Sequence, residues 1–213
     1  MTREEWDQRY AGRMLWTAEP NRFVAAELSG LTPGRALDLA TGQGRNAVWL
    51  ASQGWQVTAV DFSETGLEAA RRLAAERGVA VDWVGADVLE YTPAPGGYQL
   101  VLIAYLHLAA ASLARVLRGA VTALAPGGTI LVIGHDVANL SDGTGGPQDP
   151  AVLYTPELIT AELGGLQVTR AERVRRPVES DDGVREAIDT LVRATRPAEI
   201  DTPAGMIPES RQG

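Results

Sequence analysis

The 213-residue sequence contains no cysteine, and this absence excludes several kinds of site at once. Disulfide bonds, thiolate metal sites and cysteine nucleophiles all require the missing residue. No apolar run approaches the roughly 20 residues that a membrane-spanning helix needs. The first ten residues, MTREEWDQRY, lack the apolar segment of a secretory signal. We therefore expect a cytoplasmic protein without a membrane partner.

Positive charge is scarce as well, because 27 acidic residues oppose 19 Lys and Arg and the formal net charge is −8. A protein that binds nucleic acid needs a basic surface to neutralise phosphates. One basic cluster is present, formed by Arg170, Arg173, Arg175 and Arg176. We interpret this cluster as the solvated face of a strand. We expect no nucleic-acid partner, and the sequence leaves the oligomeric state open.

The length suits a single domain, and hydrophobic residues make up 45% of the chain, enough to bury a substantial core. We predict one domain over residues 1–196. Within it, residues 1–30 form N-terminal helices that we consider as a lid. Residues 197–213 contain several Pro and Gly residues and are predicted to form a tail outside the domain.

Strand and helix patterns alternate along the chain. Strands are predicted at residues 36–40, 56–60, 80–84, 98–104 and 129–134, and helices at 46–53, 63–77 and 113–124. Such alternation is typical of βαβ units, whose helices cover both faces of a parallel sheet. After residue 136 the pattern predicts a helix at 156–163 and two strands, 166–176 and 184–195, joined by a turn. The predicted fold is therefore α/β: a doubly wound, mostly parallel, seven-stranded sheet with a C-terminal antiparallel hairpin.

The most informative segment is the glycine-containing loop between the first strand and the next helix. Gly42 and Gly44 allow a tight turn and the close approach of a ligand to the backbone. The helix start beyond them presents free N–H groups. Residues 42–47 also match the G-x-G-x-x-A pattern of dinucleotide-binding proteins. Taken alone, the loop is equally compatible with a turn that binds nothing.

Three carboxylates at successive strands narrow the choice of ligand. Asp38 lies in the first strand, where it suits the cationic amino group of an amino-acid moiety. Asp61 follows the second strand, a position from which an acidic side chain can bind both hydroxyls of a ribose. Asp87 follows the third strand and can accept a hydrogen bond from the amine of an adenine. Singly, each residue is equally well a helix cap or a turn aspartate; together they match one ligand.

These motifs carry a resemblance to a known family. Residues 36–47, together with Asp61-Phe62, Ala86-Asp87 and residues 124–128, resemble the class I S-adenosylmethionine-dependent methyltransferases. The Gly-Arg-Asn step at 44–46 and the opening residues 6–21 look like the tellurite-resistance and thiopurine methyltransferase-like branch. The resemblance implies methyl transfer from S-adenosylmethionine to a small-molecule nucleophile.

The resemblance also implies a cofactor site. Its expected members are Asp38, Ala40, Gly42, Gly44, Arg45, Asn46, Asp61, Phe62, Asp87, Val88, Ala104 and Trp16. Two positions depart from the family pattern. Ala40 stands where the family usually has Gly, and we expect it to be accommodated with a negative φ. Gln99 replaces a usual Asp, which we expect to change local hydrogen bonding more than cofactor binding.

Candidate catalytic residues lie just after the fourth and fifth strands. In open α/β sheets, ligands bind beyond the carboxyl ends of the strands. Tyr105 and His107 follow the fourth strand and His135 follows the fifth, so both histidines of the chain lie at the expected ligand edge. Histidine exchanges a proton near neutral pH. The alternative roles are core packing for His107 and a backbone hydrogen bond for His135.

Two other functions remain open at this stage. A nicotinamide-dependent dehydrogenase would use the G-x-G-x-x-A match, although Asp38, Asp87 and the lack of a second catalytic domain disfavour it. A protein that binds S-adenosylmethionine without transferring its methyl group would show the same cofactor motifs.

Overall fold

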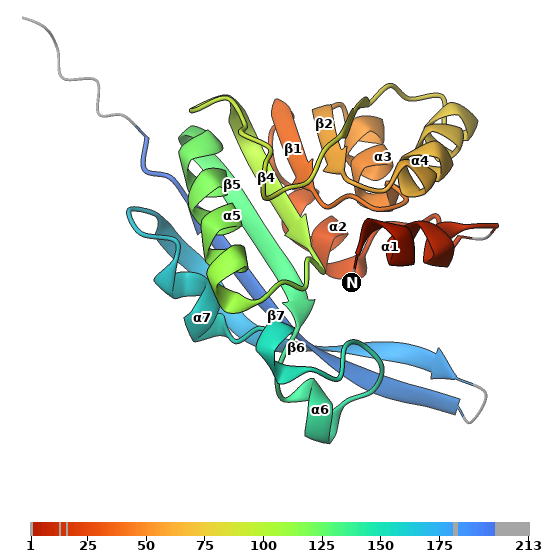
Figure 1. Cartoon of the computed structure of the whole chain (residues 1–213). Helices are drawn as coiled ribbons and strands as arrows, with labels where there is room; N and C mark the ends of the chain where they lie inside the picture. Colours follow the sequence, from red (N-terminus) through yellow and green to blue (C-terminus); the bar gives the residue numbers. More distant parts are fainter. Residues whose placement is uncertain (1, 13, 16, 181–182, 199–213) are drawn as a thin grey trace, which may run out of the picture.

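The computed structural model describes residues 2–12, 14–15, 17–180 and 183–198 (Figure 1). The helices are α1 (Arg3–Tyr10), α2 (Arg22–Leu28), α3 (Arg45–Ser52), α4 (Glu64–Glu76), α5 (Ala110–Ala123), α6 (Asn139–Asp142) and α7 (Pro156–Ala161). The strands are β1 (Arg35–Leu39), β2 (Gln56–Asp61), β3 (Asp82–Gly85), β4 (Tyr98–Ala104), β5 (Leu124–His135), β6 (Gln167–Ser180) and β7 (Gly183–Thr195). Among the described residues, no helix is long and apolar enough to cross a membrane.

The strands form one seven-stranded sheet in the order β3-β2-β1-β4-β5-β7-β6. β1 to β5 pair in parallel, whereas β7 lies antiparallel between β5 and β6. The predicted α/β fold with its C-terminal antiparallel hairpin is therefore confirmed. β2 and β3 follow one another on one side of β1, and the chain then returns to place β4 on the other side of β1. Open α/β sheets bind ligands where the strand order reverses in this way.

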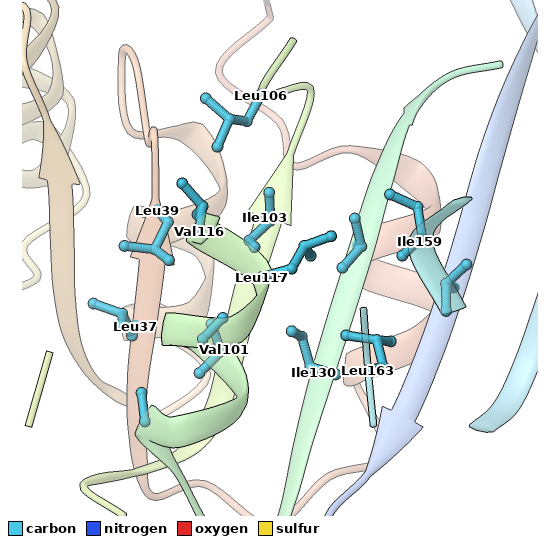
Figure 2. Packing of buried hydrophobic residues seen from close by; sticks show 14 of the residues in the cluster. Leu37, Leu39, Val101, Ile103, Leu106, Val116, Leu117, Ile130, Ile159 and Leu163 are labelled. Atoms are coloured by element: carbon cyan, nitrogen blue, oxygen red, sulfur yellow. The ribbon is translucent and has the colours of Figure 1, made fainter. Parts of the chain in front are cut away.

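One face of the sheet packs against α5 and α7 (Figure 2). Leu37 and Leu39 of β1 and Val101 and Ile103 of β4 point to this side, as expected for residues two apart in a strand. Helix α5 contributes buried residues at helical spacing, including Leu113, Val116, Leu117 and Ala120. This spacing of three to four residues is the pattern that predicted the helix.

The alternate residues of the same strands face the other way. Ala36, Leu100 and Leu102 pack with residues of α2 and α3, including Leu28 and Leu50. The central strands are thus apolar on both faces, as parallel strands covered by helices generally are. These two layers hold the strand ends rigidly at one edge, which is where the candidate site lies.

Several element boundaries differ from the prediction. β5 begins at Leu124 rather than Thr129, because residues 125–128 pair with neighbouring backbone: Gly127 N–H donates to the Arg196 carbonyl. The segment before the predicted helix at 156–163 contains a further short helix, α6. β6 and β7 extend further than predicted, and Figure 1 shows their hairpin projecting past the end of β5. The two central turn residues, Asp181 and Asp182, and most of the predicted tail lie outside the described residues.

The Gln99 side chain makes a local contact at the opposite edge. Its Oε1 accepts a hydrogen bond from the backbone N–H of Arg35 at 2.8 Å. This bond joins the starts of β1 and β4, so the predicted local hydrogen-bonding role of Gln99 is confirmed.

Candidate active site at the carboxyl edge of the sheet

The candidate site lies beyond the carboxyl ends of β1, β2, β4 and β5, with β7 running past it. The glycine-containing loop follows β1 and turns sharply into α3. Gly42 and Gly44 have positive φ values of 57° and 78°, which favour glycine at both positions. A Cβ at Gly44 would come within 2.6 Å of Ala70 Cβ, so this glycine is also required for packing against α4.

The expected negative φ at Ala40 is wrong. Ala40 has φ +61°, in the left-handed region that non-glycine residues rarely adopt. Tyr105, at the end of the neighbouring strand β4, has φ +61° as well. Its N–H donates to the Ile133 carbonyl at 2.7 Å, which fixes the turn. Strained backbone thus occurs at two adjacent strand ends on the ligand edge, where strain is often associated with function.

Asp38 is buried at the base of the glycine loop, 1% exposed. Its Oδ2 accepts a hydrogen bond from the Thr41 hydroxyl at 2.7 Å. Burial raises the pKa of Asp38 to about 7, an effect that the Thr41 hydrogen bond opposes. A buried carboxylate with only one side-chain hydrogen bond is costly to ionise, and a bound cationic group would stabilise its charge.

Asp61, at the end of β2, is held by two backbone groups. Its Oδ2 accepts from Gly42 N–H at 2.7 Å and its Oδ1 from Ser63 N–H at 2.9 Å. Burial raises the pKa of Asp61, while these two hydrogen bonds act against the increase. The backbone of Phe62 also hydrogen-bonds this carboxylate. Since a carboxylate offers about four acceptor positions, capacity remains for a ligand hydroxyl.

Helix α1 covers this part of the edge (Figure 1). The Tyr10 ring packs on the glycine loop, since a Cβ at Gly42 would lie 2.8 Å from the Tyr10 hydroxyl. Burial, and next the charge of Asp61, raise the pKa of Tyr10. Asp7 accepts hydrogen bonds from the Ser63 hydroxyl and the Thr65 N–H at the start of α4. The N-terminal helix is therefore anchored over the predicted ribose-binding residue.

Asp87 and its neighbours occupy the third strand end. Asp87 Oδ1 accepts from Leu89 N–H at 2.9 Å, so the carboxylate does cap a turn. Val88 is half-buried and packs against the core beside α5. Phe62 is half-buried, with the Arg3 guanidinium 6.0 Å from its ring centroid. Trp16, also predicted to bind the cofactor, lies outside the described residues.

Arg45 and Asn46 open helix α3. Asn46 Oδ1 accepts from the Asn21 N–H at 2.9 Å, linking α3 to the start of α2. Arg45 is partly buried, and burial lowers the pKa of its guanidinium. Ala104, the last residue of β4, is half-buried between this region and the catalytic candidates.

The three predicted catalytic residues are brought together. The ring centroids of His107 and His135 are 5.4 Å apart with an interplanar angle of 19°, and Tyr105 lies 5.1 Å from His135. His107 Nδ1 is 3.0 Å from the Val152 carbonyl oxygen, and its Nε2 is buried without a partner. Burial lowers the pKa of His107 to about 4.

A fourth member of this cluster, Asp189, is not among the sequence predictions. It lies on β7 directly opposite His135 in the β5–β7 register and is fully buried. Its Oδ2 accepts from the Tyr105 hydroxyl at 2.7 Å, and its Oδ1 lies 3.2 Å from His135 Nδ1. Burial alone would raise the pKa of Asp189, but these contacts and Arg176 lower it. The sequence feature that could have indicated Asp189 is an aspartate within the mostly apolar segment 187–192, Ala-Ile-Asp-Thr-Leu-Val.

Arg176 belongs to the same cluster. Its Nε donates to Asp189 Oδ2 at 3.0 Å, and its guanidinium lies 5.7 Å from the Tyr105 ring centroid. The interpretation of the arginine cluster as a solvated strand face is therefore wrong for Arg176. Arg173 likewise turns to a buried carboxylate, donating to Asp136 at 2.8 Å, whereas Arg175 pairs with Glu186 on the exposed hairpin.

Comparison with known sequences identifies the central part of the chain. Residues 36–128 match a family model described as a methyltransferase domain. A demethylmenaquinone methyltransferase from Thermus thermophilus is 37% identical over 103 residues, which are 47% of this chain and 47% of that protein. The chain thus spans about half the length of the first curated relatives it matches.

Comparison with solved structures supports the fold over nearly the whole chain. A structure concerned with conversion of a disulfide bond into a thioacetal group during echinomycin biosynthesis has a TM-score of 0.74 and 22% identity, covering 92% of this chain and 94% of that one. The N-methyltransferase NodS from Bradyrhizobium japonicum, in complex with S-adenosylhomocysteine, has a TM-score of 0.70 and 19% identity, covering 91% and 97%. At these identities the likeness is one of fold.

Proposed function

We propose that the protein transfers the methyl group of S-adenosylmethionine to a small-molecule nucleophile. The premise is that residues 36–128 form a methyltransferase domain of the class I, S-adenosylmethionine-dependent fold. The activity of the whole chain is the proposal, because its matched relatives extend well beyond the shared segment. The Thermus thermophilus relative is named for a quinone-type acceptor; for this chain the proposal extends to a small molecule only.

One observation carries the proposal: three carboxylates stand in a row along the sheet edge. Asp38 and Asp61 belong to β1 and β2, and Asp87 follows the end of β3; these strands are neighbours in the sheet order. Adjacent strands lie about 4.8 Å apart, so the row spans roughly 10 Å. This order suits the amino-acid, ribose and adenine parts of one extended cofactor. The buried, weakly compensated Asp38 in particular fits an ammonium group rather than a pyrophosphate.

The remaining predicted cofactor residues surround this row. The backbone of the Ala40–Gly44 loop and the start of α3 would face the amino-acid part. Phe62 and Val88 would lie against the nucleoside, with Arg45, Asn46 and Ala104 beside the sulfur end. We keep these roles, and that of Trp16, as proposals.

The catalytic task is mainly positional. The cofactor supplies a methyl group on a cationic sulfur, which is a good leaving group. The chain's residues hold the acceptor in line with that methyl, and positioning of this kind contributes about 7–11 kcal/mol in favourable cases. Tyr105, His107 and His135 are the proposed catalytic residues because they converge at the ends of β4 and β5. A base among them would add roughly 10²–10⁴-fold for an acceptor that arrives protonated.

Finer parts of the proposal rest on sequence alone. These are membership of the tellurite-resistance and thiopurine methyltransferase-like branch, a cytoplasmic location and the absence of a nucleic-acid partner. The single-domain division, with the tail from residue 197 excluded, is also a proposal.

An unbiased metabolite screen tests the proposed activity. The full chain is incubated with S-adenosylmethionine and a small-molecule extract, and products are followed by mass spectrometry. We expect at least one compound to gain the mass of one methylene only when both enzyme and cofactor are present, with S-adenosylhomocysteine formed in equal amount. Binding of the cofactor without any such product would favour a cofactor-binding protein that transfers no methyl group.

A further inference from the structure

The terminal strand brings a buried carboxylate to one of the two histidines. Asp189 lies opposite His135 across the β5–β7 pairing, and the atoms that face each other, Asp189 Oδ1 and His135 Nδ1, are 3.2 Å apart. Both atoms are buried, and neither forms a hydrogen bond in the structure, so each faces the other as its ion-pair partner. The second oxygen of Asp189 is occupied by the Tyr105 hydroxyl and by Arg176. The carboxylate is therefore fixed in orientation by three elements.

These contacts determine where each imidazole carries its proton. A carboxylate oxygen can only accept, so the tautomer with the proton on His135 Nδ1 and a lone pair on Nε2 is the one that makes this 3.2 Å contact favourable. The same reasoning applies to His107, whose Nδ1 faces the Val152 carbonyl oxygen. Both rings thus place an unprotonated Nε2 away from the groups that anchor them.

We infer, resting on the proposed methyl transfer, that Asp189 is a positioning residue that holds His135 as the base for an acceptor that arrives protonated. Asp189 orients the ring through Nδ1 and balances the positive charge that forms on it. The acceptor's proton passes to His135 Nε2 while the atom that carried the proton bonds to the methyl carbon. The carbon–sulfur bond breaks and its electron pair stays on sulfur. The proton on His135 is afterwards released to solvent.

The two histidines are not equivalent in this role. His107 has no carboxylate against its ring, and burial lowers its pKa to about 4, so it remains neutral near pH 7. Its buried, unpartnered Nε2 suits a hydrogen bond from the acceptor. His135 is the one whose ring faces a buried carboxylate through Nδ1, as in the orienting Asp–His pairs of hydrolases. The geometry therefore assigns proton uptake to His135 and substrate orientation to His107.

Histidine ¹⁵N NMR tests the inference directly, because the chain contains only two histidines. The variant His107→Gln leaves only the signals of His135 and thereby assigns the signals of both histidines. We expect His135 as the Nδ1–H tautomer with a strongly deshielded, hydrogen-bonded proton, and expect Asp189→Asn to remove that proton signature. Asp136→Asn is the matched control, because Asp136 is equally buried and paired to an arginine but bonds Thr190 and Arg173 instead. A wild-type His135 in the Nε2–H form would overturn the inference whether or not the variants fold.

A rate measurement separates this inference from the proposed function. S-adenosylhomocysteine formation is followed with S-adenosylmethionine and the small-molecule extract as the probe. Asp189→Asn is expected to lower the rate by about 10²-fold or more, with S-adenosylhomocysteine binding unchanged. An unchanged rate would overturn the inference alone. If the wild-type chain formed no methylated product, the proposed function would be contradicted. The result on the tautomer of His135 does not depend on that outcome.

Discussion

At the scale of single residues, Asp38 links the stability of the protein to its ligand. Burial raises the pKa of its carboxyl to about 7, compared with about 3.9 in an unfolded chain. The folded state therefore binds the proton more tightly. The stabilisation is fully present below pH 4 and is lost as the pH rises from about 4 through 7. A cationic ligand group at this position would offset the loss.

We predict that Asp38→Asn makes the ligand-free protein more stable at pH 8, by on the order of 2–4 kcal/mol. Asn does not ionise, so the cost of ionising a buried carboxyl whose pKa is raised by about three units is removed. The Thr41 hydroxyl can still donate to the amide oxygen. The same variant should bind S-adenosylhomocysteine more weakly. Chemical denaturation and calorimetry measure the two effects. The exposed Asp82→Asn is the control, and a destabilised Asp38→Asn at pH 8 would show that the ionised carboxylate is well accommodated.

Ala40 provides a second residue-scale test. Its left-handed backbone costs about 1–2 kcal/mol for an L-residue, while glycine loses about 0.4–1 kcal/mol more in chain entropy. Ala40→Gly should therefore raise the free energy of unfolding by up to about 1 kcal/mol. The exposed Ala75→Gly in α4 should lower it by about 1 kcal/mol, because its backbone is helical. An equal decrease in the free energy of unfolding in both variants would argue against backbone strain at Ala40.

At the scale of elements, α1 is predicted to gate cofactor access. It is tied to the start of α4 through Asp7, and its Tyr10 covers the glycine loop. Asp7→Ala removes hydrogen bonds to a charged group, which contribute about 1.5–3 kcal/mol. S-adenosylhomocysteine should then dissociate roughly ten- to a hundredfold faster in stopped-flow tryptophan fluorescence. The exposed Gln8→Ala should dissociate at the wild-type rate, and an equal rate for Asp7→Ala would show that α1 does not gate the site.

The sequence predicts an element well when the pattern that defines it lies within the element's own residues. β4 matches its predicted bounds, Tyr98–Ala104, because its apolar run is bounded by a Pro- and Gly-containing loop. Helix α5 likewise shows a regular buried face. The short α6 has no such period, and its Asn139 is fixed by contacts to the Gly145 carbonyl and the Ile188 N–H. The bond to Ile188 exists only once β7 is in place.

At the scale of the whole molecule, the candidate site was predictable only in part. Asp38 and Asp61 follow from loops near their own strands, where short motifs have local meaning. Asp189 and Arg176 reach the site through the register of β7 against β5 and β6, which no local pattern determines. The left-handed backbone of Ala40 has no local signal in the sequence either. The sequence thus indicated the cofactor residues, which stay a prediction, and three of the five residues of the catalytic cluster.

The most direct test of the central claim is which cofactor this edge binds. Isothermal calorimetry on the full chain compares S-adenosylhomocysteine with NAD, in the wild type and in Asp61→Ala. We predict saturable binding of S-adenosylhomocysteine and no comparable binding of NAD. Asp61→Ala should weaken the former by roughly ten- to a hundredfold, the equivalent of about 1.5–3 kcal/mol. Tighter binding of NAD than of S-adenosylhomocysteine by the folded wild-type chain would contradict the account.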